Sequence, residues 1–216
     1  MKREIFDGAV VMIGEFAGPG GYPIKLVRIL AESGAKNLTI IANSAGGSGM
    51  VLPFEDHDVL FKNRQVKKII CSFPAPINVD TEAKQQISVG EVELILMPQG
   101  NMIEAIRAGG AGIPAFYTPV GVGTLFAEGK ETREFHGKKY MLQESLRADF
   151  ALIRAYGADS KKNLIYRGSS RHFNPVMATA ADYVVAEVDF YGTFFNPESI
   201  VTPGLFVDEV ITSDAC

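Results

Sequence analysis

Short apolar runs alternate with helical patterns along the first hundred residues, and this alternation constrains the fold more than any other feature. Ala9 to Ile13 reads as a buried strand. Apolar residues then recur at three- and four-residue spacing from Ile24 until Gly34, which predicts a helix of about ten residues. Further strands are predicted at 37–42, 66–71 and 91–97, with helices at 54–63 and 81–89 between them. Such alternation favours an open, mostly parallel α/β sheet with helices on both faces.

Past Gly109 the alternation weakens. Residues 131–142 centre on His136-Gly137 and alternate polar with apolar positions, which predicts a solvent-facing hairpin. Apolar runs at 148–153 and 183–188 return to the strand pattern. The chain has no internal repeat and no linker-like stretch, so a single domain over residues 1–216 is predicted.

The charge pattern argues against two classes of partner. Net charge is -4 and the basic residues form no stripe, so nucleic acid is not an expected ligand. No apolar stretch approaches the roughly 20 residues that span a bilayer, and we expect no membrane partner and a cytoplasmic location. Cys71 and Cys216 are too few and too far apart for a disulfide framework, so both are expected to be reduced.

A glycine-rich segment, 14–23, joins the first predicted strand to the first predicted helix. Its glycines either make a tight turn or let the backbone approach a ligand, and the helix start offers N–H groups to an anion. The segment does not fit a dinucleotide fingerprint, because Pro23 stands where the third glycine belongs and no acidic residue ends the second strand. It also lacks the Gly-Lys-Ser/Thr of a P-loop.

Gln99 directly follows the fourth predicted strand, in the sequence Met97-Pro98-Gln99-Gly100. Ligands bind at the carboxyl ends of the strands in such sheets, and a carboxamide there can donate an N–H to a developing oxyanion. The alternative is that Gln99 caps the helix predicted after it or bonds to a neighbouring loop.

These segments together resemble the alpha subunits of family I (3-oxoacid type) coenzyme A transferases. The resemblance begins with Asp7-Gly8, Gly14, Phe16 and Gly21-Tyr22-Pro23 and covers essentially the whole chain. Its strongest part runs nearly uninterrupted from Pro98 to Gly123, and further matches lie at 128–130, 148–153, 163–164, 171–175 and 202–204.

The resemblance implies a set of functional residues. It implies that coenzyme A (CoA) is bound by Gly14, Glu15, Phe16, Ala17, Gly18, Pro19, Gly20 and Gly21. It places Gln99 in the active site and implies substrate contacts from Asn43, Ser44, Gly100, Gly110 and Tyr117.

The chain departs from the family pattern in three ways. Glu15 replaces the second glycine of the usual Gly-Gly-Phe, the loop has one extra residue, and Ser44 stands where a second asparagine is common. A carboxylate facing polyanionic CoA would repel it unless paired. The alternative is that Glu15 points outward or pairs with a basic residue of the other subunit.

The implied activity is CoA transfer between an acyl-CoA (acetyl-, butyryl- or succinyl-CoA) and a short carboxylate or 3-oxoacid such as acetoacetate, as in fatty acid metabolism. CoA is then a substrate, and no permanent cofactor is expected. In the resembling family a glutamate of a Ser-Glu-Asn-Gly type segment on the beta subunit is the ping-pong nucleophile and forms a glutamyl-CoA thioester. This chain has no such segment, so a beta subunit, in an alpha2beta2 assembly, is implied.

Two other functions stay open from the residues alone. One is a phosphate- or nucleotide-binding α/β protein of the sugar-phosphate isomerase type, and the other is a non-catalytic partner subunit. His57, His136 and His172 are not at metal-ligand spacing, so no metal site is predicted and surface, loop or packing roles are expected for them.

Overall fold

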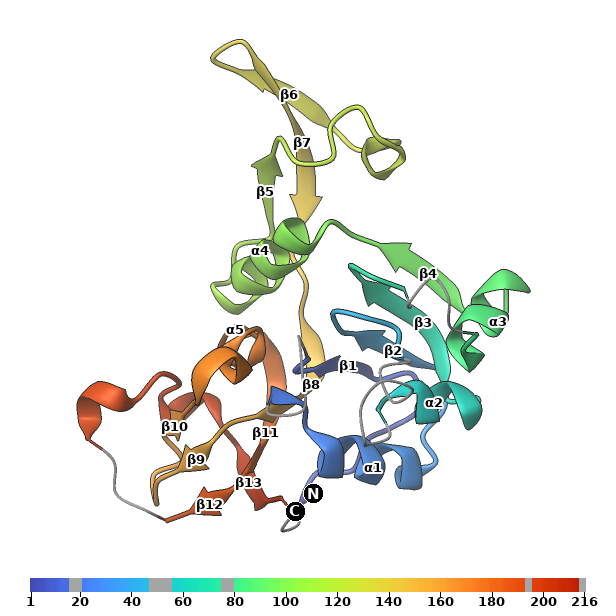
Figure 1. Cartoon of the computed structure of the whole chain (residues 1–216). Coiled ribbons are helices and arrows are strands. Elements are labelled where there is room, and N and C mark those ends of the chain that lie inside the picture. The colour runs from blue at the N-terminus through green and yellow to red at the C-terminus, as the bar shows by residue number, and fades with distance from the viewer. Residues whose placement is uncertain (16–20, 47–55, 75–79, 193–195, 214–216) are drawn as a thin grey trace.

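The computed structural model describes residues 1–15, 21–46, 56–74, 80–192 and 196–213. Its main sheet has the order β13-β11-β8-β1-β2-β3-β4, and every neighbouring pair in it is parallel (Figure 1). The predicted parallel sheet is therefore confirmed. The strands are β1 (Val10–Ile13), β2 (Leu38–Ile41), β3 (Val66–Cys71), β4 (Glu93–Leu96), β8 (Ala148–Arg154), β11 (Ala181–Val188) and β13 (Glu209–Thr212).

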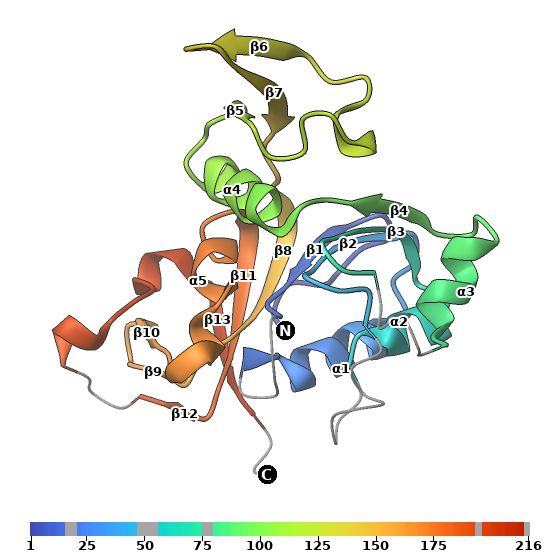
Figure 2. The ribbon, with the colours of Figure 1, turned by 45° about the horizontal axis from the view of Figure 1, so that its top comes forward.

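Helices cover both faces of this sheet, as the sequence predicted. Along β1, Val11 and Ile13 face one apolar cluster while Met12 faces the other, because successive side chains of a strand point to opposite faces. Helices α1 and α2 lie beneath the sheet and α4 lies above it (Figure 2). The helices of the first face are α1 (Ile24–Ser33), α2 (Asp58–Lys62) and α3 (Glu82–Ser88), and those of the second are α4 (Gln99–Gly110) and α5 (Asn174–Met177).

The chain winds in opposite directions from β1. Strands β2, β3 and β4 follow one another on one side of β1, whereas β8, β11 and β13 extend the sheet on the other side. In open α/β sheets, ligands bind outside the carboxyl ends of the strands where this reversal occurs. Here that point lies between β1 and β8, and the N–H of Gly14 donates to the carbonyl of Leu152 across it at 2.8 Å.

A separate antiparallel sheet projects from the main body (Figure 1). It consists of β5 (Ala115–Thr118), β6 (Thr132–Phe135) and β7 (Lys138–Glu144), and β7 leads back into β8. The predicted hairpin is β6–β7. Its two turn residues, His136 and Gly137, have φ values of 50° and 73°, as a tight two-residue hairpin turn requires.

The remaining elements are short and were not predicted. A small sheet contains β9 (Gly157–Ala158), β10 (Leu164–Ile165) and β12 (Phe190–Tyr191), and 3-10 turns occur at Leu125–Ala127, Gly168–Arg171, Pro197–Ser199 and Gly204–Phe206. Two-residue strands carry no periodic signal, which is why sequence patterns miss them. Within the described ranges, no helix combines the length and apolar character needed to cross a bilayer.

Candidate active site at the carboxyl edge of the sheet

The carboxamide of Gln99 lies at the start of α4 and contacts the loop that follows β2. Its Nε2 donates to Asn43 Oδ1 at 2.8 Å, and the Ser72 hydroxyl donates to the same oxygen at 2.7 Å. Asn43 follows β2, Ser72 follows β3 and Gln99 follows β4. The carboxyl ends of three neighbouring strands therefore converge on one side-chain oxygen, and two predicted site residues are in direct contact.

The start of α4 also offers hydrogen-bond donors and open space to a ligand. Pro98 is its N-cap and no side chain caps it, so N–H groups of the first turn remain directed outward, where a negative charge is favoured. A methyl group built on Gly100 would meet nothing within 4 Å. This edge can accordingly admit a carbonyl oxygen close to the backbone and to Gln99.

Glu15 turns toward the loop after β2 and is half-buried. Its Oε1 accepts from the Ser44 hydroxyl at 2.7 Å, and its Oε2 accepts from the Ser44 N–H at 3.0 Å. Ser44 Oγ in turn accepts from the N–H of Gly46 at 3.1 Å. Ser44 thus supplies two donors that hold the Glu15 carboxylate against the loop after β2. The two atypical residues of the sequence are thus direct partners.

His57 lies in the turn before α2 and is fully buried, so a surface role is wrong for it, although it does occupy a loop. Its Nε2 lies 3.0 Å from the Ser44 carbonyl, which can only accept, so Nε2 carries the proton. In the neutral ring Nδ1 then accepts from the Tyr22 hydroxyl at 3.0 Å. Burial, followed by the charges of Asp56 and Glu15, raises the pKa of Tyr22 well above its usual value, so the phenol stays a donor.

The start of α1 is already occupied. The N–H groups of Lys25 and Leu26 both donate to Glu187 Oε2, at 2.8 and 3.1 Å, and Glu187 is buried on β11. The N–H groups of Ile24 and Val27 donate to backbone carbonyls. The expectation that this helix start offers free N–H groups to an anion is therefore wrong, because a carboxylate of the chain itself takes that place.

Asn174 fastens both ends of the glycine-rich segment. Its Nδ2 donates to the carbonyls of Gly21 and Ser170 at 3.1 and 3.0 Å, and its Oδ1 accepts from the N–H of Arg154 at 3.0 Å. A Cβ on Gly14 would overlap Asn174 Oδ1. A single fully buried amide thus fixes where the segment leaves β1 and where it enters α1.

His172 packs against the same segment, in agreement with the packing role predicted for it. A Cβ on Gly21 would overlap His172 Nε2, and the N–H of Phe173 donates to His172 Nδ1 at 2.7 Å. Burial lowers the pKa of His172 to about 4, although a hydrogen bond with the Gly21 backbone opposes this shift. The ring is consequently neutral at physiological pH.

The other predicted residues are placed less closely together. Gly110 ends α4, eleven residues after Gln99 and therefore about 16 Å along the helix, where it packs on Thr179. Tyr117 precedes Thr118, which bonds to Asn101 in the first turn of α4. The Tyr117 hydroxyl itself donates to Glu131, the residue before β6 of the projecting sheet. The rest of the predicted CoA-binding loop lies outside the described residues: Phe16, Ala17, Gly18, Pro19 and Gly20.

Titratable side chains of the described ranges form no cluster of three or more His, Cys, Asp and Glu that could hold a metal ion. Cys71 is buried at the end of β3 and unbridged. Burial raises the pKa of its thiol to about 12, so it is protonated and a poor nucleophile.

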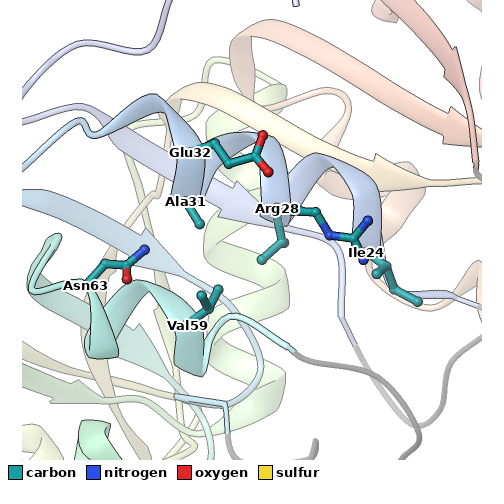
Figure 3. Close-up of a pocket in the computed structure, with 7 residues that line it drawn as sticks. Ile24, Arg28, Ala31, Glu32, Val59 and Asn63 are labelled. Atoms are coloured by element: carbon teal, nitrogen blue, oxygen red, sulfur yellow. The ribbon is translucent and has the colours of Figure 1, made fainter.

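A pocket of about 340 Å³ lies between α1 and α2, away from these residues (Figure 3). Ile24, Ala31 and Val59 supply apolar surface, and Arg28 and Glu32 are its charged lining residues. None of the residues at the carboxyl edge of β2, β3 or β4 lines it. It belongs to the groove between two helices and not to the candidate site.

Residues 1–213 match the family model for coenzyme A transferase. One subunit of the 3-oxoadipate CoA-transferase of Acinetobacter baylyi is 45% identical over 96% of this chain and 89% of that protein. The human mitochondrial succinyl-CoA:3-ketoacid coenzyme A transferase 2 is 39% identical over 98% of this chain but only 43% of that protein. The chain therefore belongs to the coenzyme A transferase family. Within it, the chain is a CoA-transferase subunit of the alpha type.

Solved structures agree with the fold. The glutaconate coenzyme A-transferase of Acidaminococcus fermentans superimposes with a TM-score of 0.80 at 18% identity, over 97% of this chain and 72% of that chain. At this identity the likeness establishes the shared α/β architecture alone.

Proposed function

We propose that this chain is the CoA-handling half of a two-chain transferase that moves CoA between an acyl-CoA and a short carboxylate or 3-oxoacid. The observation that carries the proposal is the contact between Gln99 and Asn43 at the open carboxyl edge of the sheet, in a chain of this family. In this role the glycine segment binds CoA, while Asn43, Ser44 and Gly100 face the acyl group. We also assign Gly110 and Tyr117 to the substrate site, but only as it is completed by the other subunits of the assembly.

The nucleophile is assigned to a separate beta subunit. The human relative is more than twice as long as the matched region, which is consistent with one fused chain doing the work of two. The partner's glutamate attacks the thioester carbonyl and expels CoA as a thiolate, which leaves an acyl-glutamyl anhydride. The thiolate then attacks the glutamyl carbonyl of this anhydride, releases the donor's carboxylate and gives glutamyl-CoA. The acceptor carboxylate runs the same two steps in reverse, which forms the new acyl-CoA and frees the glutamate. Gln99 donates an N–H to the oxyanion that forms at each attack. We infer an alpha2beta2 assembly in the cytoplasm.

The sugar-phosphate or nucleotide alternative is not favoured. A phosphate held by the glycine segment would need N–H groups at the start of α1, and Glu187 already takes two of them. We also infer that residues 1–216 act as one domain, because β1 and β13 are strands of the same sheet.

The test is to assay acetyl-CoA with butyrate or acetoacetate, using the chain alone, its partner alone and the co-expressed complex. Turnover should require both chains, and a glutamyl-CoA adduct should be trapped on the partner. Full turnover by the isolated chain would overturn the two-chain proposal. A complex that binds CoA but never turns over would show a non-catalytic role instead.

A further inference from the structure

Glu15 places a carboxylate beside Asn43 and Ser44, the residues proposed to face the acyl group. Its carboxylate follows β1, next to the reversal point of the sheet, and bonds to Ser44. Ser44 is the immediate neighbour of Asn43, which receives the Gln99 hydrogen bond. The carboxylate and the candidate oxyanion donor are thus linked through two adjacent residues of one loop.

The environment keeps this charge in place without cancelling it. Both hydrogen bonds to Glu15 come from neutral donors, and among the residues that the structure describes no Lys or Arg forms an ion pair with it. The charge is also felt nearby, since Glu15 contributes to the raised pKa of both Tyr22 and Cys71.

A fixed, half-buried charge discriminates between ligands that differ in charge. A substrate with a second carboxylate would bring a like charge toward Glu15, whereas a monocarboxylate acyl group would not. We propose that Glu15, held by Ser44, is a specificity-determining residue that makes this transferase select acyl groups and acceptors lacking a second carboxylate. This rests on the proposed function and names its substrate class.

The selection runs against the substrates in the names of the Acinetobacter and human relatives, since 3-oxoadipate and succinate are both dicarboxylates. High sequence identity to those proteins therefore does not carry their acyl preference to this chain. The two positions at which the sequence departs from the family pattern, Glu15 and Ser44, act together as one device.

The experiment uses the co-expressed two-chain complex with acetyl-CoA as donor. Butyrate and succinate are the acceptors, because they have equal carbon number and differ by one terminal carboxylate. The ratio of kcat/KM for butyrate to kcat/KM for succinate should exceed one in the parent enzyme, and Glu15→Gln should lower it about tenfold, as for two unit charges roughly 12 Å apart at an effective dielectric constant of about 20. Glu15→Gln keeps the shape and one acceptor for Ser44.

Glu91→Gln is the matched control. It removes the same charge at the opposite, amino-terminal edge of β4, where Glu91 pairs with Arg64, and it should leave the ratio unchanged. A measurement on the parent enzyme is independent of any variant: its butyrate preference should shrink as salt rises, because salt screens the repulsion.

Four outcomes would overturn the inference. An unchanged ratio in Glu15→Gln, or a parent enzyme that prefers succinate, would overturn the inference while leaving the proposed function intact. A butyrate preference that salt does not alter would assign the selection to shape instead of charge and would also overturn it. No turnover with either acid or with acetoacetate would overturn the proposed function and the inference with it.

Discussion

The Nε2 of Gln99 donates to Asn43 Oδ1 over 2.8 Å, which joins the first residue of α4 to the loop after β2. This contact orients the carboxamide across the carboxyl edge of the sheet and leaves its second N–H for a ligand. Asn43 Oδ1 also accepts from Ser72, so residues that follow three different strands together hold the Gln99 carboxamide in one orientation. Orientation of this kind is what an oxyanion donor needs before the reaction begins.

Replacing Gln99 by alanine should lower kcat of the two-chain complex on the order of 100-fold, because an oxyanion donor acts mainly in the transition state. KM for the acyl-CoA should change much less. Steady-state kinetics of the complex give both constants. Gln85→Ala is the control, since Gln85 is an exposed glutamine on α3 that bonds to Asp80 and should tolerate the change. Unchanged turnover in Gln99→Ala would remove Gln99 from the active site.

Asn174→Asp should loosen the glycine segment without changing the size of the side chain. The carboxylate cannot donate to the carbonyls of Gly21 and Ser170, so two buried acceptors lose their partner. The free energy of unfolding should fall by about 1–3 kcal/mol, and KM for acyl-CoA should rise more than kcat falls. Urea unfolding and steady-state kinetics measure these effects.

Asn196→Asp provides the comparison for that variant. Asn196 is exposed and only accepts, from the N–H of Glu198, which an aspartate does equally well. Its stability and kinetics should match the parent enzyme. If Asn174→Asp behaved in the same way as Asn196→Asp, the fastening role of Asn174 would be refuted.

Gly14→Ala should be destabilising for a steric reason. Its new methyl group would overlap Asn174 Oδ1, and the backbone of Gly14 is held by its hydrogen bond to Leu152. Relief requires moving a buried side chain, which costs about 1–3 kcal/mol. Gly100→Ala is the control, because open space surrounds that position and alanine favours a helix. Thermal or urea unfolding should show a loss for the first variant and none for the second.

His172 should make stability depend on pH. Its folded pKa of about 4 lies below the unfolded value of about 6.5, so neutral His172 contributes stability above pH 6.5 that is lost as pH falls through 4. The full effect is about 3 kcal/mol. Unfolding free energies measured between about pH 7 and pH 4.5 should fall less steeply for His172→Gln than for the parent. Parallel pH profiles would contradict a buried, neutral His172.

Local patterns in the sequence determined most of the architecture. Apolar runs and helical spacing predicted the strands of the parallel sheet except β13, because the inner strands are largely buried on both faces and read as short apolar runs. The hairpin at His136-Gly137 followed from turn chemistry, which is equally local. The position of Gln99 directly after a strand predicted its place at the ligand edge, since strand ends of a parallel sheet share one edge.

Only the tertiary structure decided which distant residues serve that edge. Glu187 accepts from an N–H at the start of α1 although it lies 161 residues away in the sequence. Asn174 likewise donates to the carbonyl of Gly21, which is 153 residues away. His57 is a buried partner of Tyr22 and Ser44, and nothing in its sequence spacing indicates either contact. Periodicity reports which face of an element is apolar, but it carries no information on which polar groups meet when elements pack. Glu15 and Ser44 are separate oddities in the sequence, and folding alone makes them one hydrogen-bonded pair.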